Sequence, residues 1–295
     1  MSAFAPGELS TPAGASRRDT EASMATVAPA PIGRTRRILV AVGPPLVALI
    51  VLIAVWQAST VVFAIPPYLF PGPFHVVTGA WDARDALTSA VLHTFKDAMT
   101  GFVLSVVVGV ASAIALSSST LLYRSLYPYA VLLQTIPIVT ISPIIIILMG
   151  TGDSSIITIA FIVAAFPIIS NATMGLTSVD HNLINLFQMY NASPWQSLIK
   201  MRLPHALPYI LTGLRISSGL SVIGAVVGEF FAGSGGEDGG LGYIIQVAQN
   251  RMLMDELYAA ALLSSLLGIA VFALVGVISH LTLHNWHESA VQREN

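Results

Sequence analysis

Only a few residues of this chain have the side-chain types and the spacing that binding of an ion, a metal or a phosphate group would require. Glu229 stands alone in an apolar stretch, and an acidic group at membrane depth is a candidate for binding a solute or an ion. His280, His284 and His287 recur at the helical spacing of metal ligands, but a lone helix offers no fourth ligand, so we expect an interfacial histidine cluster. The glycine-rich segment 233–243 lacks the Gly-Lys-Ser/Thr ending of a phosphate-binding loop.

No nucleophile with a paired base can be assembled from the remaining polar residues, so we expect neither an enzyme nor a bound cofactor. Of the 295 residues, 55% are hydrophobic and only 9% are charged, whereas roughly 25% are charged in a soluble domain. The chain has no cysteine, which excludes disulfides and thiolate metal sites. It also lacks the concentrated basic face that nucleic acid would require. The composition predicts a membrane protein.

Six segments are apolar over the roughly 20 residues that a helix needs to cross a bilayer. We therefore expect an all-α protein with six transmembrane helices, at residues 38–64, 97–117, 126–149, 155–176, 207–231 and 257–281. These positions divide the chain into a disordered tail (1–36), a transmembrane domain (37–283) and a C-terminal tail (284–295).

The first apolar run begins at Ile38, after three arginines, so it is expected to be a retained span and not a cleaved signal peptide. Either Met1 or Met24 could be the first translated residue. With the N-terminus inside, ten Lys and Arg residues fall on the cytoplasmic side and three outside. The positive-inside rule then places both termini, and the long loop 177–206, in the cytoplasm.

The loop 177–206 contains the pattern of two short helices. An apolar stripe at positions i, i+3, i+4 and i+7 predicts the first helix, and it consists of Leu183, Leu186, Phe187 and Tyr190. Ser193 is a suitable N-cap for a second helix that begins at Pro194. Asn191 tolerates the left-handed conformation that a corner between them requires. Such a corner fits either a groove on a partner protein or the lipid interface.

Pro204 and Pro208 follow the second helix and restrict how the chain enters the fifth span. We therefore expect the two short helices to be held at a fixed angle to that span, as a rigid joint.

The stretch "NASPWQSLIKMRLPHALPYILTGLRI" resembles the cytoplasmic signature of permease subunits of bacterial ABC importers. In that family Glu-Ala-Ala precedes a glycine and then Ile-x-Leu-Pro. This chain has Asn185, Leu186 and Phe187 in place of the first three, Asn191 in place of the glycine, and retains Leu203 and Pro204. "IPPYLFPGP", "QTIPIVTISPIIIILMG" and "GEFFAGSGGEDGGLGYII" also resemble the nitrate/sulfonate/taurine branch, so the likeness covers about residues 66–281.

The resemblance implies the type I (MetI-like) importer permease fold in the bacterial cytoplasmic (inner) membrane. It also implies an external substrate-binding protein, a second permease copy and two cytoplasmic ATPases, which bind the ATP and Mg²⁺. In the family the cytoplasmic corner is a coupling helix that docks into the ATPase. The residues expected to couple here are Asn185, Leu186, Phe187, Tyr190, Asn191, Ala192, Trp195, Leu203 and Pro204.

Span three is the expected lining of the translocation pathway, because its prolines release backbone carbonyls as discontinuous transporter helices do. The candidate residues are Gln134, Thr135, Pro137, Thr140, Ser142 and Pro143, together with Glu229. An equal alternative for the polar residues of span three is that they form hydrogen bonds to neighbouring helices. The alternative for Glu229 is that it caps the turn that follows the fifth span. Gly224 and Gly228 form a Gly-x-x-x-Gly pair that allows close helix contact, within one chain or across a dimer.

These features predict the permease subunit of an ATP-driven importer, working as a homodimer. The alternative is a secondary transporter driven by an ion gradient, which would need inverted repeats and intramembrane ionisable residues. The spans contain no charged cluster, so selectivity is expected to reside mainly in the external binding protein. The expected substrate is a small polar solute, either like nitrate, sulfonate, taurine or bicarbonate, or like a pyrimidine precursor.

Overall fold

The computed structural model describes residues 34–233 and 239–291, and in these ranges the regular structure is helical. The chain divides into two units, residues 1–55 and residues 56–295. Most of helix α2 (Arg34–Val62) lies in the first unit. Its apolar window, Gly43–Val62, has no buried residue, as expected for a span whose side chains face lipid.

The second unit contains the remaining helices. They are α3 (Pro73–Asp82), α4 (Arg84–Ser118), α5 (Thr120–Thr135), α6 (Ile138–Met149), α7 (Asp153–Thr177), α8 (His181–Met189), α9 (Pro194–Ser197), the π-helix η1 (Leu198–Arg202), α10 (Leu203–Ala232), α11 (Leu241–Arg251) and α12 (Met254–Val291). Five helices of the described chain are long and apolar enough to cross a membrane, which confirms a multi-pass α-helical fold.

The third predicted span is divided between two helices. α5 ends at Thr135 and α6 begins at Ile138, with Ile136 in an extended conformation (φ −77°, ψ 123°). The ring of Pro137 disfavours a helical conformation at the preceding residue and removes a backbone donor, so the helix ends there. The predicted interruption is confirmed at Pro137, whereas Pro143 lies inside α6 without ending it. Neither piece alone reaches the length of a full span.

The core of the second unit forms where α7 packs against α4 and α10, through positions that lack side chains. A Cβ placed on Gly101 of α4 would lie 2.7 Å from the Cβ of Ala160, and one placed on Gly224 of α10 would lie 2.7 Å from the Cα of Ala160. At Gly228 the nearest atom would be the Cα of Ile156, at 3.1 Å. The Gly224 and Gly228 pair therefore brings two helices of one chain together, which resolves the alternative that the sequence left open.

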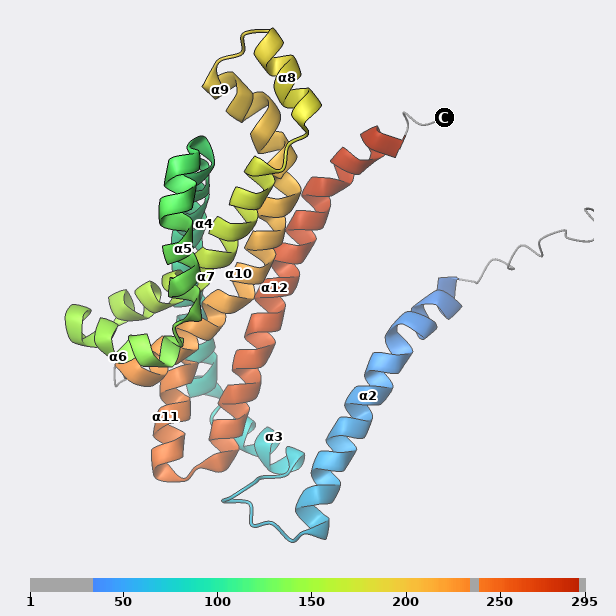
Figure 1. The fold of residues 1–295 in the computed structure, drawn as a ribbon. Helices are drawn as coiled ribbons and strands as arrows, with labels where there is room; N and C mark the ends of the chain where they lie inside the picture. Colours follow the sequence, from blue (N-terminus) through green and yellow to red (C-terminus); the bar gives the residue numbers. More distant parts are fainter. Residues whose placement is uncertain (1–33, 234–238, 292–295) are drawn as a thin grey trace, which may run out of the picture. The chain divides into compact units, whose positions relative to one another are not determined.

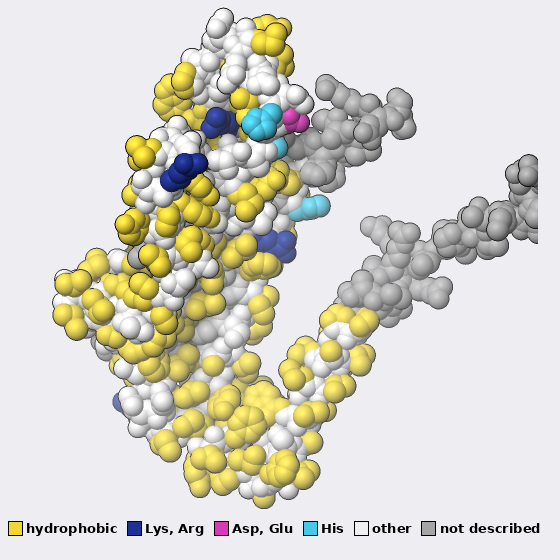
Figure 2. Space-filling model, viewed as in Figure 1, with side chains coloured by type: hydrophobic (Ala, Val, Ile, Leu, Met, Phe, Trp, Pro, Cys, Tyr) yellow, Lys and Arg dark blue, Asp and Glu magenta, His cyan; other side chains and the backbone are white. Residues whose placement is uncertain are grey.

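The second unit has two distinct ends (Figure 1). α8 and α9 lie at one end, which we call the α8–α9 end, and α3 and α11 lie toward the other, the α11 end. On the face of this unit seen in Figure 2, hydrophobic side chains predominate and most Lys and Arg side chains lie toward the α8–α9 end. That distribution supports the prediction that the α8–α9 end is cytoplasmic.

Candidate functional site

The corner between α8 and α9, residues 181–197, has the conformation that the sequence predicts. The Asp180 side chain caps α8 by accepting a hydrogen bond from the Asn182 amide at 2.7 Å. The chain then turns at Asn191, whose φ is +50°. Ser193 and Gln196 cap α9 reciprocally: the Gln196 amide donates to Ser193 Oγ at 3.2 Å, and the Ser193 amide donates to Gln196 Oε1 at 2.9 Å.

The connection from this corner into the membrane is helical throughout. α9, η1 and α10 follow one another without a gap, and Pro204 lies in the first turn of α10, directly after the π-helical turn η1. Arg202 Nη1 also donates to the carbonyl oxygen of Ser117, at the end of α4, at 3.2 Å. The prolines therefore do not separate the corner from the fifth span, and Arg202 is a contact that the sequence pattern did not reveal.

The surface of the corner is apolar and exposed. Met189 and Tyr190 are each 80% exposed and Trp195 is 70% exposed, although such side chains are normally covered. Of the other predicted coupling residues, Asn185, Leu186 and Asn191 are exposed, whereas Phe187, Ala192, Leu203 and Pro204 are half-buried. The structure thus brings most of the predicted set to one corner, and adds Met189, which lies outside the apolar stripe. A surface of this kind can bind another protein.

The predicted pathway residues separate into two groups. Gln134, Thr135 and Pro137 line a cavity of about 380 Å³ at the α5–α6 break, together with side chains of α7 and α10. Thr140 and Pro143 are exposed outside that lining, and Ser142 is buried and donates to the Ile138 carbonyl at 2.8 Å. Three of the seven predicted pathway residues therefore line one cavity at the break between α5 and α6.

Glu229 is 2% exposed and joins three helices. Its Oε2 accepts hydrogen bonds from Thr94 Oγ1 of α4 and from the amide of Gly242 of α11, both at 2.9 Å. The Leu241 amide donates in turn to Thr94 Oγ1 at 2.9 Å. The carboxylate lies at the N-terminus of α11, where the free amides and the helix dipole favour a negative charge. This geometry matches the capping alternative, and a pathway role for Glu229 stays a prediction.

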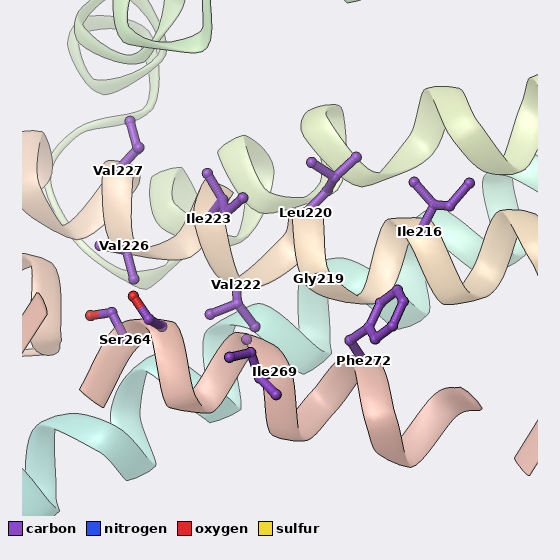
Figure 3. A pocket seen from close by; sticks show the side chains of 12 residues that line it. Ile216, Gly219, Leu220, Val222, Ile223, Val226, Val227, Ser264, Ile269 and Phe272 are labelled. Carbon is purple, nitrogen blue, oxygen red and sulfur yellow. The ribbon is translucent and has the colours of Figure 1, made fainter. Parts of the chain in front are cut away.

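An apolar groove of about 570 Å³ runs between α10 and α12 (Figure 3). Figure 3 shows Ser264 and Phe272 of α12 at opposite ends of the groove, with Ile216, Leu220 and Ile223 along α10. The Arg215 guanidinium lies 4.5 Å from the centre of the Phe272 ring, a cation–π contact. The sequence did not predict this groove, because it depends on how two distant helices pack.

Some predicted features lie outside the described residues. These are the tail 1–33, the centre of the glycine-rich segment (234–238) and the end of the chain (292–295). The side chains of His284 and His287 are outside as well, so the interfacial histidine cluster stays a prediction.

Known proteins are similar to this chain in sequence and in fold. Residues 105–292 match the family model described as "Binding-protein-dependent transport system inner membrane component". A probable ABC transporter permease protein of Haemophilus influenzae is 31% identical over 236 residues, which cover 80% of this chain and 95% of the relative. The formylaminopyrimidine transport permease protein ThiX of Halalkalibacterium halodurans is 30% identical over 81% of this chain and 94% of its own.

Two further similarities bear on the branch and the fold. The putative aliphatic sulfonates transport permease protein SsuC of Bacillus subtilis is 29% identical, over 78% of this chain and 79% of its own. A chain of the inward-facing methionine ABC transporter MetNI superposes with a TM-score of 0.52 at 20% identity, covering 65% of this chain and 95% of that chain. This likeness confirms the expected fold class.

Proposed function

Since the chain belongs to the family of binding-protein-dependent transport system inner membrane components, we propose that it forms the alternating-access pore of an ATP-driven importer. It is a multi-pass protein of the inner membrane and a permease subunit. In this proposal ATP is hydrolysed by a separate chain, and the permease transmits the resulting motion to the pore.

The exposed apolar corner between α8 and α9 supports this proposal most strongly. Tyr190 and Trp195 are 80% and 70% exposed on a corner that is held by a capping box and a left-handed Asn191. A rigid apolar corner loses little conformational entropy when a partner covers it, which favours tight docking. Because α9 continues through η1 into α10, a displacement of the corner would be transmitted to the fifth span. We assign the docking partner to the cytoplasmic ATPase.

The assembly we propose contains two copies of this chain. One chain supplies one corner, and the family resemblance implies ATPases that work in pairs, so a second copy related by a twofold axis would supply the second corner. An external binding protein would deliver the solute to the α11 end.

The proposed solute is small and polar. Two of the relatives named above are a formylaminopyrimidine permease and a putative sulfonate permease, both for small polar molecules. The cavity at the α5–α6 break, about 380 Å³ with Gln134 and Thr135 in its lining, is the proposed part of the pathway in this chain. Its lining carries hydrogen-bonding groups but no charge, so it could pass such a solute without holding it tightly.

The test of coupling is a substitution that adds charge to the corner. Tyr190→Asp should abolish co-purification of the ATPase, because docking would bury an unpaired carboxylate, while the permease still inserts into the membrane. Tyr68→Asp is the matched control, since Tyr68 is 61% exposed and lies in a different part of the chain. It should leave co-purification unchanged.

Unchanged ATPase co-purification in Tyr190→Asp would contradict the assignment of the corner. Solute uptake that persists after ATP depletion and collapses with the proton gradient would contradict the importer itself, in favour of a secondary transporter. Asn185→Glu sharpens the test: it should tighten ATPase binding if the partner presents an arginine there, because a carboxylate forms a charge-assisted pair that an amide cannot form.

A further inference from the structure

A second polar cluster lies at the α11 end, between α4 and the start of α7. His93 and Asp97 are one turn apart on α4, and Asp153 is the first residue of α7. One nitrogen or oxygen atom of each of these three side chains lies within 4.8 Å of the others. Lys96 Nζ also contacts Asp153, at 2.9 Å from Oδ2. The cluster joins two helices that are distant in sequence.

Asp97 is the unusual member of this cluster. Its side chain is fully buried, with 0% exposure, and neither of its carboxylate oxygens has a hydrogen-bond partner. His93 Nδ1 lies 3.7 Å from Oδ2, an ion-pair distance that is beyond hydrogen-bond distance. A charged carboxylate that is buried without hydrogen bonds is costly, and a cation bound beside it would offset that cost.

We infer that His93, Asp97 and Asp153 form a binding site for a divalent cation of the zinc class, which bridges α4 and α7. One imidazole and two carboxylates suit such a borderline cation, whereas Mg²⁺ and Ca²⁺ prefer oxygen ligands only. With bonds of about 2.0–2.2 Å, two ligands of a tetrahedral ion lie roughly 3.4 Å apart. The 3.7 Å between His93 and Asp97 is close to that spacing, and Asp153, whose ligand atom lies within 4.8 Å of the other two, needs to approach by at most roughly 1.4 Å.

Lys96 does not prevent this coordination. A carboxylate has two oxygens, so Asp153 can keep Lys96 at Oδ2 and offer Oδ1 to the cation. Two of the three ligands are partly exposed, at 20% for His93 and 44% for Asp153, which leaves a route of entry and room for water as a fourth ligand. The bound cation would fix the turn before α7 against α4.

Zinc binding by the purified full chain tests the site. The protein is isolated through a tag without histidine, stripped with EDTA and titrated with ZnCl₂ by calorimetry. Asp97→Asn and His93→Gln should each lose one zinc equivalent per chain, or bind it more than roughly tenfold more weakly. Asp85→Asn and His75→Gln are the matched controls on exposed residues, and they should bind as the wild type does. Zinc held elsewhere, for instance at His280, cancels in these comparisons.

Thermal unfolding distinguishes a cation site from a simple imidazolium–carboxylate pair. In EDTA, Asp97→Asn should have a Tm equal to or above that of the wild type, because it removes a buried charge that has no hydrogen-bond partner. At roughly ten times the Kd of zinc, the wild-type Tm should rise by about 3 °C and the Asp97→Asn Tm should stay constant. Equal zinc stoichiometry with equal affinity, or equal Tm responses, in wild type and Asp97→Asn would overturn the site. If Asp97→Asn fails to fold, the same comparison with the partly exposed His93→Gln decides.

Discussion

The corner at the α8–α9 end has apolar side chains that are exposed, whereas the contact of α4, α10 and α11 at the other end is made by polar side chains that are buried. Tyr190 is 80% exposed, and Glu229 is 2% exposed with partners on two other helices. Covering an exposed apolar side chain with another molecule is favourable, because its surface is removed from water. A buried carboxylate, in contrast, is stabilised by hydrogen bonds from neighbouring groups of the fold. The difference indicates that the corner is open to contact by another molecule, whereas hydrogen bonds within the chain hold α4, α10 and α11 together.

Removing the carboxylate at the α11 end should have the largest effect on stability. Glu229→Ala leaves the Thr94 hydroxyl and the Gly242 amide without their acceptor, and should lower the free energy of unfolding by about 3 kcal/mol. Unfolding by SDS in detergent micelles measures this loss. Glu229→Gln keeps an acceptor oxygen and should lose less than half as much. A loss below about 1 kcal/mol in Glu229→Ala would mean that this end is not held together internally.

A smaller effect is expected from the hydroxyl that accompanies Glu229. Thr94→Val keeps the shape of the side chain but removes both the donor to Glu229 and the acceptor for the Leu241 amide, at a cost of about 2 kcal/mol. Thr100→Val is the control on the same helix, because Thr100 is exposed and bonds only its own helix; it should change stability by less than about 0.5 kcal/mol.

The double variant Thr94→Val/Glu229→Gln sharpens this test. Its loss should be smaller than the sum of the two single losses, because the two residues share one network. Additive losses would show that Thr94 and Glu229 act separately.

The smallest effect is expected at the exposed corner. Ser193→Ala removes the cap of α9, a loss of about 1 kcal/mol that should be local, because this corner has no buried side chain to unfold with it. Amide hydrogen exchange at residues 194–197 should accelerate about fivefold while global stability is unchanged. Ser193→Asp retains a capping oxygen and should exchange as the wild type does. A global loss equal to that of Thr94→Val would remove the contrast between the two ends.

Much of the corner and of the helix boundaries could be predicted because their signals are local. The corner depends on a segment of six residues, which contains Asn191, Ser193 and the capping partner Gln196. The break between α5 and α6 depends on Pro137, which restricts the residue directly before it. Pro143 shows the limit of such reasoning, since a proline inside α6 left the helix unbroken. Proline ends a helix only where the lost hydrogen bond and the ring contact are not compensated by neighbouring helices or by a slight bend.

The membrane class and the turn and caps of the α8–α9 corner follow from the sequence alone, because apolar length and capping act within about 20 residues. Only the tertiary structure decided which partners the buried polar residues find. Thr94 and Glu229 are 135 positions apart, and Lys96 and Asp153 are 57 apart. Their pairing depends on how α4, α7 and α10 pack around small residues such as Ala160 and Gly224, and a shift of one helical turn would separate every pair.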